Sequence, residues 1–231
     1  MNEELKSIIL VNGSPKLQVE WSASEQLLRL QESAMKSPEI EIRRIHVRSS
    51  LKQGETREDF EAMLNADAII FSFPLYIFCL PGVLIRYLQD FHEYWKEQQG
   101  FRKKVRISAV VNCGFPEAFI NEEAIRVIKS FCRQTGASFH QGIMLGGGGM
   151  LVGSQDVPYM KRMYMELERT YRRIAEDILE DNQKTYETVS FRANCPSRLY
   201  YFMGNRGWYH QVKKNGLKRK DLYRRPYLKT Q

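Results

Sequence analysis

The sequence of 231 residues predicts an α/β fold, with a parallel sheet covered by helices on both faces. Three observations lead to this class. Short apolar segments alternate with segments of helical periodicity five times along the chain. Several of the short segments are apolar on both faces, as strands buried inside a parallel sheet are. No internal repeat interrupts the alternation, and units of this kind build parallel sheets.

The first part of the chain predicts three strands. Residues 8–11 form an uninterrupted apolar run, and a helix is expected over 24–35. Residues 39–47 alternate between apolar and polar side chains, which predicts a strand nearer the sheet edge. A short helix over 57–65 then leads to residues 66–73, the most apolar of the predicted strands.

The second part of the chain completes the sheet. A helix follows Pro81-Gly82, because proline fits the first helical turn and one apolar stripe runs through the segment behind it. Residues 105–111 and 138–145 predict the fourth and fifth strands, separated by a helix over 117–135. A long amphipathic helix over 157–179 ends the series.

Composition limits the class of protein. With 43% apolar and 27% charged residues, the chain can bury one core, and no apolar run is long enough to cross a bilayer. The acidic Met-Asn-Glu-Glu start does not predict a secretory signal. The four cysteines lack CxxC spacing and the four histidines are scattered, so we expect no zinc, iron–sulfur or other metal site and a cytoplasmic location.

Charge is distributed unevenly along the chain. Residues 1–183 carry 23 Lys and Arg against 25 Asp and Glu, whereas residues 184–231 carry 12 Lys and Arg against two acids. The net charge of +8 therefore belongs to the C-terminal part. We expect a ligand-binding domain over 1–183 and a basic, aromatic-rich extension over 184–231.

The segment Asn12-Gly13-Ser14-Pro15 points to a phosphate site. It follows a predicted strand, and the next helical pattern begins behind Ser22. A small-residue loop between a strand and a helix leaves backbone N–H groups free for an anion, and the helix dipole adds to the attraction. The alternative is that Ser14-Pro15 is only a turn and Ser22 only a helix cap.

Three further loops are expected at the same edge of the sheet. In a parallel sheet, ligands bind outside the carboxyl ends of the strands, where strand order reverses. An aromatic, proline-rich segment (74–82) follows the third predicted strand, and glycine-containing segments (112–117 and 146–150) follow the fourth and fifth. This set suits a flat aromatic ring attached to a phosphate. The aromatic residues Tyr76 and Phe78 could instead be buried packing residues.

These segments together resemble a known family. GSPK followed by Ser-x-Ser, then PLYIFCLPG, NCGFPEA and GGGGM, resemble the NADPH-dependent FMN reductase branch of the flavodoxin-like fold over roughly residues 6–183. The resemblance implies a five-stranded sheet of order 2-1-3-4-5, FMN at its carboxyl edge, and a homodimer or homotetramer. It implies that the FMN phosphate is held by Ser14, Lys16, Ser22 and Ser24. It implies that the rest of the cofactor is contacted by Pro74, Leu75, Tyr76, Ile77, Phe78, Asn112, Cys113, Gly114 and Phe115.

The resemblance implies an oxidoreductase that takes a hydride from NADPH or NADH through FMN to a quinone, a nitro or azo compound, or a flavin. The flavin carries this chemistry, so no catalytic side chain is expected. The alternative is a non-catalytic flavoprotein, an electron carrier or a redox-responsive module that holds a partner through its basic tail. A P-loop hydrolase is disfavoured because Gly13-Ser-Pro-Lys lacks the required spacing.

Several other residues have less direct interpretations. We expect Cys113 and Cys79 to be small packing residues rather than reactive thiols, and His92 and His140 to be structural. The glycine run marks a close backbone approach, so Gly147 and Gly148 are candidate substrate contacts. Arg206 is a candidate for the 2′-phosphate of NADPH.

The C-terminal extension predicts two short helices joined at Gly204, the second ending at Asn215-Gly216. Its many aromatic residues are expected to pack on the body, a partner subunit or the mouth of the flavin site. We favour a solvated basic face on a dimerisation arm. Contact with nucleic acid or an anionic membrane is the less favoured alternative.

Overall fold

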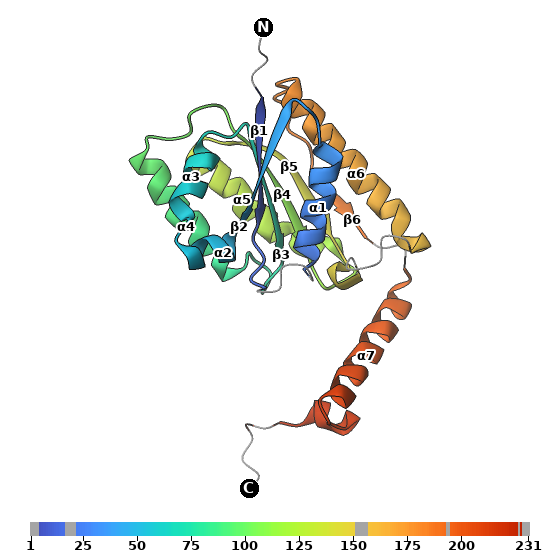
Figure 1. Ribbon diagram of the computed structural model, residues 1–231. Helices are drawn as coiled ribbons and strands as arrows, with labels where there is room; N and C mark the ends of the chain where they lie inside the picture. Colours follow the sequence, from blue (N-terminus) through green and yellow to red (C-terminus); the bar gives the residue numbers. More distant parts are fainter. Residues whose placement is uncertain (1–4, 17–21, 151–156, 193–194, 226, 228–231) are drawn as a thin grey trace. The chain divides into compact units, whose positions relative to one another are not determined.

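The computed structural model describes residues 5–16, 22–150, 157–192, 195–225 and 227. The chain divides into two compact units, Met1–Ala193 and Asn194–Gln231. The first unit is a three-layer α/β structure in which helices cover both faces of one sheet (Figure 1). The division lies ten residues beyond the boundary predicted after residue 183, because a further strand belongs to the first unit.

The sheet is parallel throughout and has the strand order β2-β1-β3-β4-β5-β6. The six strands are β1 (Lys6–Asn12), β2 (Ile40–His46), β3 (Ala68–Pro74), β4 (Arg106–Asn112), β5 (Ser138–Leu145) and β6 (Val189–Phe191). The predicted 2-1-3-4-5 order is confirmed, with β6 added beside β5. Strand order reverses at β1, so the switch point lies between β1 and β3.

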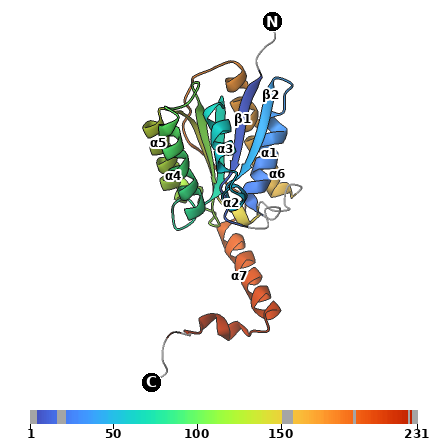
Figure 2. The same cartoon turned by 60° about the vertical axis from the view of Figure 1, so that its left-hand side comes forward.

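Two apolar layers hold the helices on the sheet. On one face lie α1 (Ala23–Met35) and α6 (Pro158–Leu179), and on the other lie α2 (Val47–Gln53), α3 (Thr56–Leu64), α4 (Gly82–Glu97) and α5 (Glu122–Thr135) (Figures 1 and 2). Successive residues of β1 point to opposite faces. Ile8 and Leu10 therefore pack in the α1–α6 layer, whereas Ile9 and Val11 pack in the other.

Three local predictions differ from the structure. The prediction of a fifth and final strand missed β6, a three-residue strand whose Phe191 carbonyl accepts the Gly146 N–H at 2.9 Å. The helix expected from residue 117 begins as a 3-10 turn, η2 (Ala118–Asn121), before α5. Helix α2 was not predicted, because its seven residues are too few for periodicity to distinguish them from a loop.

Among its described residues, the second unit contains one helix, α7 (Ser197–Lys214), and a 3-10 turn, η4 (Arg219–Tyr223). The prediction of two helices joined at Gly204 is therefore wrong, although the end at Asn215 is as expected. Glycine inside a helix costs only about 1 kcal/mol relative to alanine, which does not suffice to end a helix when the surrounding residues favour it.

Candidate functional site

The loop after β1 donates hydrogen bonds to β3 and to the last residue of β1. The Gly13 N–H donates to the Ser72 carbonyl of β3, and the Ser14 N–H donates to the Asn12 side-chain oxygen, each at 2.9 Å. These two donors, which the sequence interpretation leaves free for an anion, are thus used within the protein. A Cβ at Gly13 would lie 2.7 Å from the Leu84 side chain, so the loop passes tightly over α4.

The donors that remain for an anion lie in the first turn of α1. Ser22 caps this helix, and its hydroxyl accepts the Glu25 N–H at 3.0 Å. The alternative interpretation of Ser22 as a helix cap is thus confirmed. The N–H groups of Ala23 and Ser24 precede the first intrahelical bonds and have no acceptor among the described residues. The helix dipole adds positive potential at the same point.

A buried carboxylate lies directly behind this loop. Glu25 is 3% exposed, and its carboxylate accepts from the Asn12 Nδ2 at 3.1 Å and from Arg44 at 3.2 Å. The same Asn12 side chain accepts the Ser14 N–H on its other side. Glu25 therefore fixes the orientation of the Asn12 amide, which in turn fixes the backbone at Ser14. Sequence reasoning missed this residue.

Asn112, at the end of β4, ties three of the predicted loops together. Its Nδ2 donates to the Ser24 hydroxyl and to the Phe73 carbonyl, both at 3.2 Å. Its own carbonyl accepts the Leu75 N–H at 2.7 Å. Asn112 is 4% exposed, so these bonds are shielded from bulk water. The convergence of the loops after β1, β3 and β4 at one edge is confirmed.

The segment after β3 makes a tight turn with an apolar tip. Tyr76 and Cys79 exchange two backbone hydrogen bonds, of 2.9 and 3.0 Å, across a two-residue connection. Ile77 and Phe78 occupy its centre with backbone φ angles of 49° and 58°, which residues other than glycine and asparagine rarely adopt. Ile77 is 94% exposed and Phe78 61%. The strained turn therefore projects two large apolar side chains into solvent.

The glycine run after β5 brings its backbone against the β4 loop. The Gly147 N–H donates to the Phe115 carbonyl at 2.7 Å, and the Gly148 N–H donates to the Cys113 carbonyl at 2.6 Å. A Cβ at Gly146 would lie 2.3 Å from the Pro116 carbonyl oxygen. This spacing admits no side chain, which confirms the close backbone approach that the glycines predict.

These loops enclose a cavity of about 340 Å³, within the range of small-molecule sites. One end carries hydroxyl, ammonium and helix N-terminal groups, and the other end is made of aromatic, proline and glycine residues. The cavity is lined by Ser14, Lys16, Ala23, Ser24, Pro74, Tyr76, Asn112, Gly148 and Gly149. Seven of these nine are predicted site residues. Ala23 and Gly149 were missed, although both adjoin predicted residues.

The other predicted site residues do not line this cavity. Ser22 is buried in the α1 cap, Leu75 is half-buried, and Ile77, Phe78, Gly114 and Phe115 are exposed. Gly147, within the glycine run, is buried. Arg206 is exposed on α7 in the second unit, and its proposed contact with NADPH stays a prediction.

Cys113 does not have the surroundings of a reactive thiol. Burial raises its pKa above the ordinary value, and its Sγ lies 3.4 Å from the Phe115 carbonyl oxygen. The thiol thus stays protonated and braces the β4 loop, in agreement with the packing role expected for it.

His140 lies near the amino end of β5, away from the cavity. Its Nε2 is 3.2 Å from the Asp177 carboxylate of α6, and burial lowers its pKa more than Asp177 raises it. Asp177 also accepts from Tyr186 and Asn182. This group fastens the end of α6 to the sheet, as the structural role expected for His140 requires. Among the described residues, no cluster of His, Cys, Asp or Glu is arranged to hold a metal ion.

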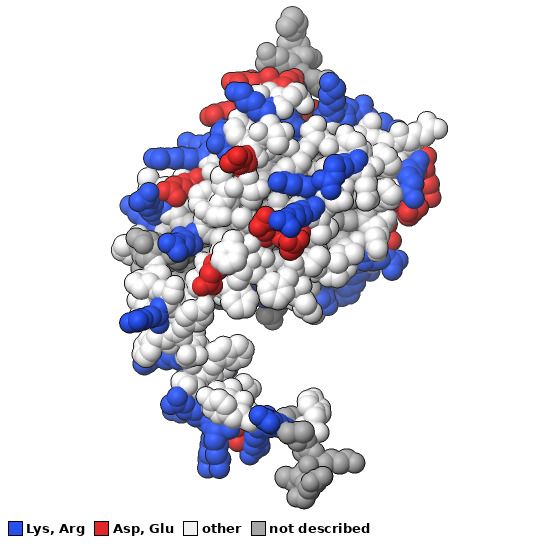
Figure 3. Space-filling model, turned by 180° about the vertical axis from the view of Figure 1, so that it is seen from behind, with Lys and Arg blue, Asp and Glu red and all other residues white. Residues whose placement is uncertain are grey.

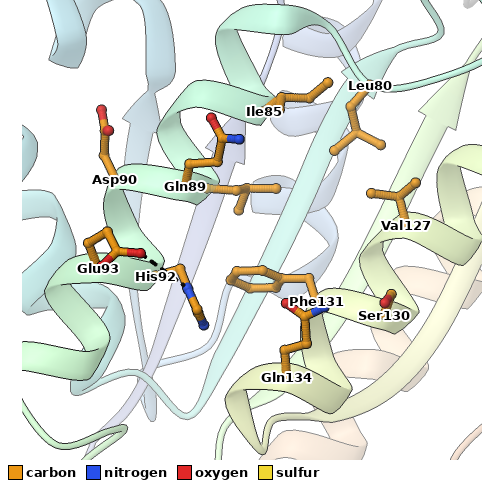
Figure 4. Close-up of a pocket in the computed structure, with 11 residues that line it drawn as sticks. Leu80, Ile85, Gln89, Asp90, His92, Glu93, Val127, Ser130, Phe131 and Gln134 are labelled. Atoms are coloured by element: carbon orange, nitrogen blue, oxygen red, sulfur yellow. Dashed lines mark ion pairs between the residues drawn. The ribbon is translucent and has the colours of Figure 1, made fainter.

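A second hollow, of about 450 Å³, lies between α4 and α5 (Figure 4). Its apolar lining includes Leu80, Val127 and Phe131, and the acidic residues Asp90 and Glu93 also line it. Apart from Leu80, its lining comes from α4 and α5, and no predicted site residue lines it. The loop cavity is therefore the candidate site.

Comparison with known proteins agrees with the fold. Residues 6–149, more than half of the chain, match the family model described as the flavodoxin-like fold. The chain belongs to the flavodoxin-like fold family. The matched range contains β1 to β5 and every residue lining the loop cavity. A search of curated proteins finds no match for the chain.

Solved structures of similar fold support this assignment to the flavodoxin-like family. An FMN-dependent NADH-azoreductase from Bacillus anthracis, in complex with FMN, is 14% identical with a TM-score of 0.54, over 74% of this chain and 100% of that one. An NAD(P)H:quinone oxidoreductase from Methanothermobacter marburgensis is 16% identical with a TM-score of 0.54, over 74% and 99%. The apo form of an NADH:FMN oxidoreductase is 18% identical with a TM-score of 0.52, over 73% and 89%. At these identities the likeness establishes the fold.

Proposed function

We propose that this flavodoxin-like protein binds FMN in the loop cavity and acts as an NAD(P)H-dependent oxidoreductase. The observation that carries the proposal is the polarity of the cavity. Donors and a cationic side chain gather at the α1 end, and apolar and backbone surfaces gather at the other. FMN has the matching division into a phosphate and a planar ring. The similar structures described above include an NADH-azoreductase in complex with FMN.

The phosphate end is the better defined part of the proposed site. Ser14, Lys16 and Ser24 would hold the phosphate together with the free N–H groups at the start of α1. Ser24 accepts a hydrogen bond from Asn112, so its own hydroxyl hydrogen remains available to donate. Of the four residues predicted for the phosphate, Ser22 has its acceptor capacity engaged in capping α1.

The ring end is shaped for a flat group. Pro74 and Tyr76 form one wall, and the backbone at Gly148 and Gly149 forms another. A Cβ at Gly149 would meet nothing within 4 Å, so a side chain there would enter open space beside the cavity. Exposed Phe115 and the apolar tip at Ile77 and Phe78 offer surfaces on which a nicotinamide or an aromatic acceptor could stack.

Bound FMN supplies the redox chemistry, because it accepts a hydride from a nicotinamide and passes electrons to an acceptor. The protein's part in this proposal is binding and orientation. Lys16 and the α1 dipole offset the charge of the phosphate. The loops around Asn112, which are fixed by buried hydrogen bonds, present a preformed surface to the ring.

The first test is to identify the chromophore by mass and to titrate the apoprotein with FMN and, separately, with riboflavin, which lacks the phosphate. Lys16→Gln is expected to weaken FMN binding about tenfold, since it removes one charged contact, and to leave riboflavin binding unchanged. Lys36→Gln, at the other end of α1, is the matched control. Equal loss of FMN and riboflavin binding in Lys16→Gln would show that Lys16 does not contact the phosphate.

The second test separates an enzyme from a non-catalytic flavoprotein. The FMN-loaded protein is mixed with NADPH or NADH in a stopped-flow instrument, and the flavin band near about 450 nm is followed. Rapid bleaching, followed by recovery when a quinone or azo dye is added, is the expected result. A band that persists with both nucleotides would favour the electron carrier or binding module.

A further inference from the structure

The second unit combines positive charge with exposed apolar side chains. From residue 194 onward the sequence has ten Lys and Arg and a single acid, Asp221. Asp221 is already engaged, because it pairs with Arg224 at 2.8 Å and accepts the Lys218 N–H at 2.7 Å. Figure 3 shows Lys and Arg side chains gathered around the far end of this unit. The unit therefore presents a strongly positive surface.

The apolar side chains of this unit do not form a core of their own. Val212 is its one buried apolar residue among those the structure describes. Trp208 is 66% exposed, Phe202 62% and Tyr223 74%. Aliphatic side chains are exposed beside them, namely Leu199, Met203, Leu217 and Leu222. Trp208, Phe202 and Tyr223, which the sequence interpretation expects to pack, are thus still available to a partner.

Internal contacts hold α7 and η4 together as one surface. The Leu217 N–H donates to the Val212 carbonyl at 3.0 Å, so the chain turns directly after the helix. The Arg219 guanidinium stacks over the Tyr209 ring at 4.2 Å. Arg219 therefore lies at the Tyr209 ring, and the same stretch of chain carries four further basic residues, namely Lys213, Lys214, Lys218 and Lys220.

We propose that α7 and η4 form a surface that binds an anionic lipid bilayer. Charge complementarity draws the basic side chains to anionic headgroups. Trp and Tyr prefer the interfacial region, where an apolar ring and a polar edge are both accommodated. The bilayer is preferred to nucleic acid because exposed Leu and Met side chains gain free energy when they enter hydrocarbon, whereas a phosphate backbone offers them no apolar interior. None of the described helices is long and apolar enough to span a membrane.

The test is co-sedimentation of the full-length protein with vesicles of phosphatidylcholine alone or with 30% phosphatidylglycerol, a composition of about the charge density that attracts basic segments. Binding is expected only to the anionic vesicles, and it should fall when salt shortens the screening length. A variant with Lys213, Lys214, Lys218 and Lys220 all changed to Gln should bind on the order of 1,000-fold more weakly. Trp208→Ala should weaken binding about tenfold.

The matched control removes four exposed basic residues from the first unit by changing Lys36, Lys52, Arg133 and Lys161 to Gln. It should bind anionic vesicles as the wild type does. Equal loss in both quadruple variants, or equal binding to neutral and anionic vesicles, would overturn the proposal. Two other results would do the same. One is tighter binding to a 20-nucleotide single strand than to anionic vesicles. The other is a wild-type protein that binds no vesicles and self-associates in sedimentation velocity through the basic residues of the second unit.

Discussion

Glu25→Gln tests how the proposed phosphate loop is held in place. The substitution keeps the shape of the side chain and removes its charge. Glu25 is 3% exposed and accepts hydrogen bonds from Asn12, Arg29 and Arg44 at 3.1, 3.3 and 3.2 Å. Because Asn12 also accepts the Ser14 N–H, a change at Glu25 is transmitted to the loop backbone.

The size of the effect follows from these contacts. A buried hydrogen bond to a charged group contributes about 1.5–3 kcal/mol. The bond from Arg29 counts for less, since that side chain is 60% exposed. Arg44 keeps a second carboxylate, Glu32. We therefore expect Glu25→Gln to lower the free energy of unfolding by about 2 kcal/mol, which lowers Tm by about 4–8 °C in a protein of this size. We expect FMN affinity to fall about tenfold.

Glu32→Gln is the control, because it removes the other partner of Arg44 without touching Asn12. Glu32 is partly exposed, so its loss should cost less than about 1 kcal/mol and leave FMN affinity unchanged. Thermal unfolding of the apoprotein and fluorescence titration with FMN measure the two effects. If Glu25→Gln matched the wild type in both, the network behind Asn12 would have no role in positioning the loop.

Three further predictions concern separate parts of the fold. Gly146→Ala should lower the free energy of unfolding, measured by urea titration, by about 2–3 kcal/mol, because its Cβ would lie 2.3 Å from the Pro116 carbonyl oxygen. Gly149→Ala should change this free energy by less than about 0.5 kcal/mol, because its Cβ would meet nothing within 4 Å. Similar values for the two would contradict the close approach. The pKa of His140 is lowered in the folded protein, so the unfolded chain binds the proton first as pH falls below about 6.5. Stability should therefore decrease from pH 7.5 to 5.5, and His140→Gln should flatten this slope; an unchanged slope would show that other groups cause it. Ile77→Asn should raise the free energy of unfolding by about 1 kcal/mol, because Asn tolerates the positive φ and the Ile77 side chain is almost fully exposed. An unchanged or lower free energy of unfolding would show that the turn is not strained.

The sequence located most of the candidate site because the site is built from segments that carry local signals. Ser14, Pro74, Asn112 and Gly148 each lie at or just after the end of an apolar strand, and the carboxyl ends of parallel strands meet at one edge. What it missed depends on contacts between distant residues. Glu25 is one of many acidic residues in a helix until β2 places Arg44 against it. Glu25 and Arg44 are 19 positions apart, so local periodicity does not indicate that they pair.

The sequence by itself determined the alternation of the first five strands with helices, the parallel sheet and the basic character of the C-terminal residues. These depend on periodicity, turn residues and charge, which are properties of neighbouring positions. Only the tertiary structure decided that Val189–Phe191 joins the sheet and that the Gly13 and Ser14 donors are used within the protein. It also decided that α7 continues through Gly204 with its aromatic residues uncovered within its own unit. A strand of three residues, a satisfied donor and an exposed ring all depend on which distant groups come together, and that is settled only when the chain packs.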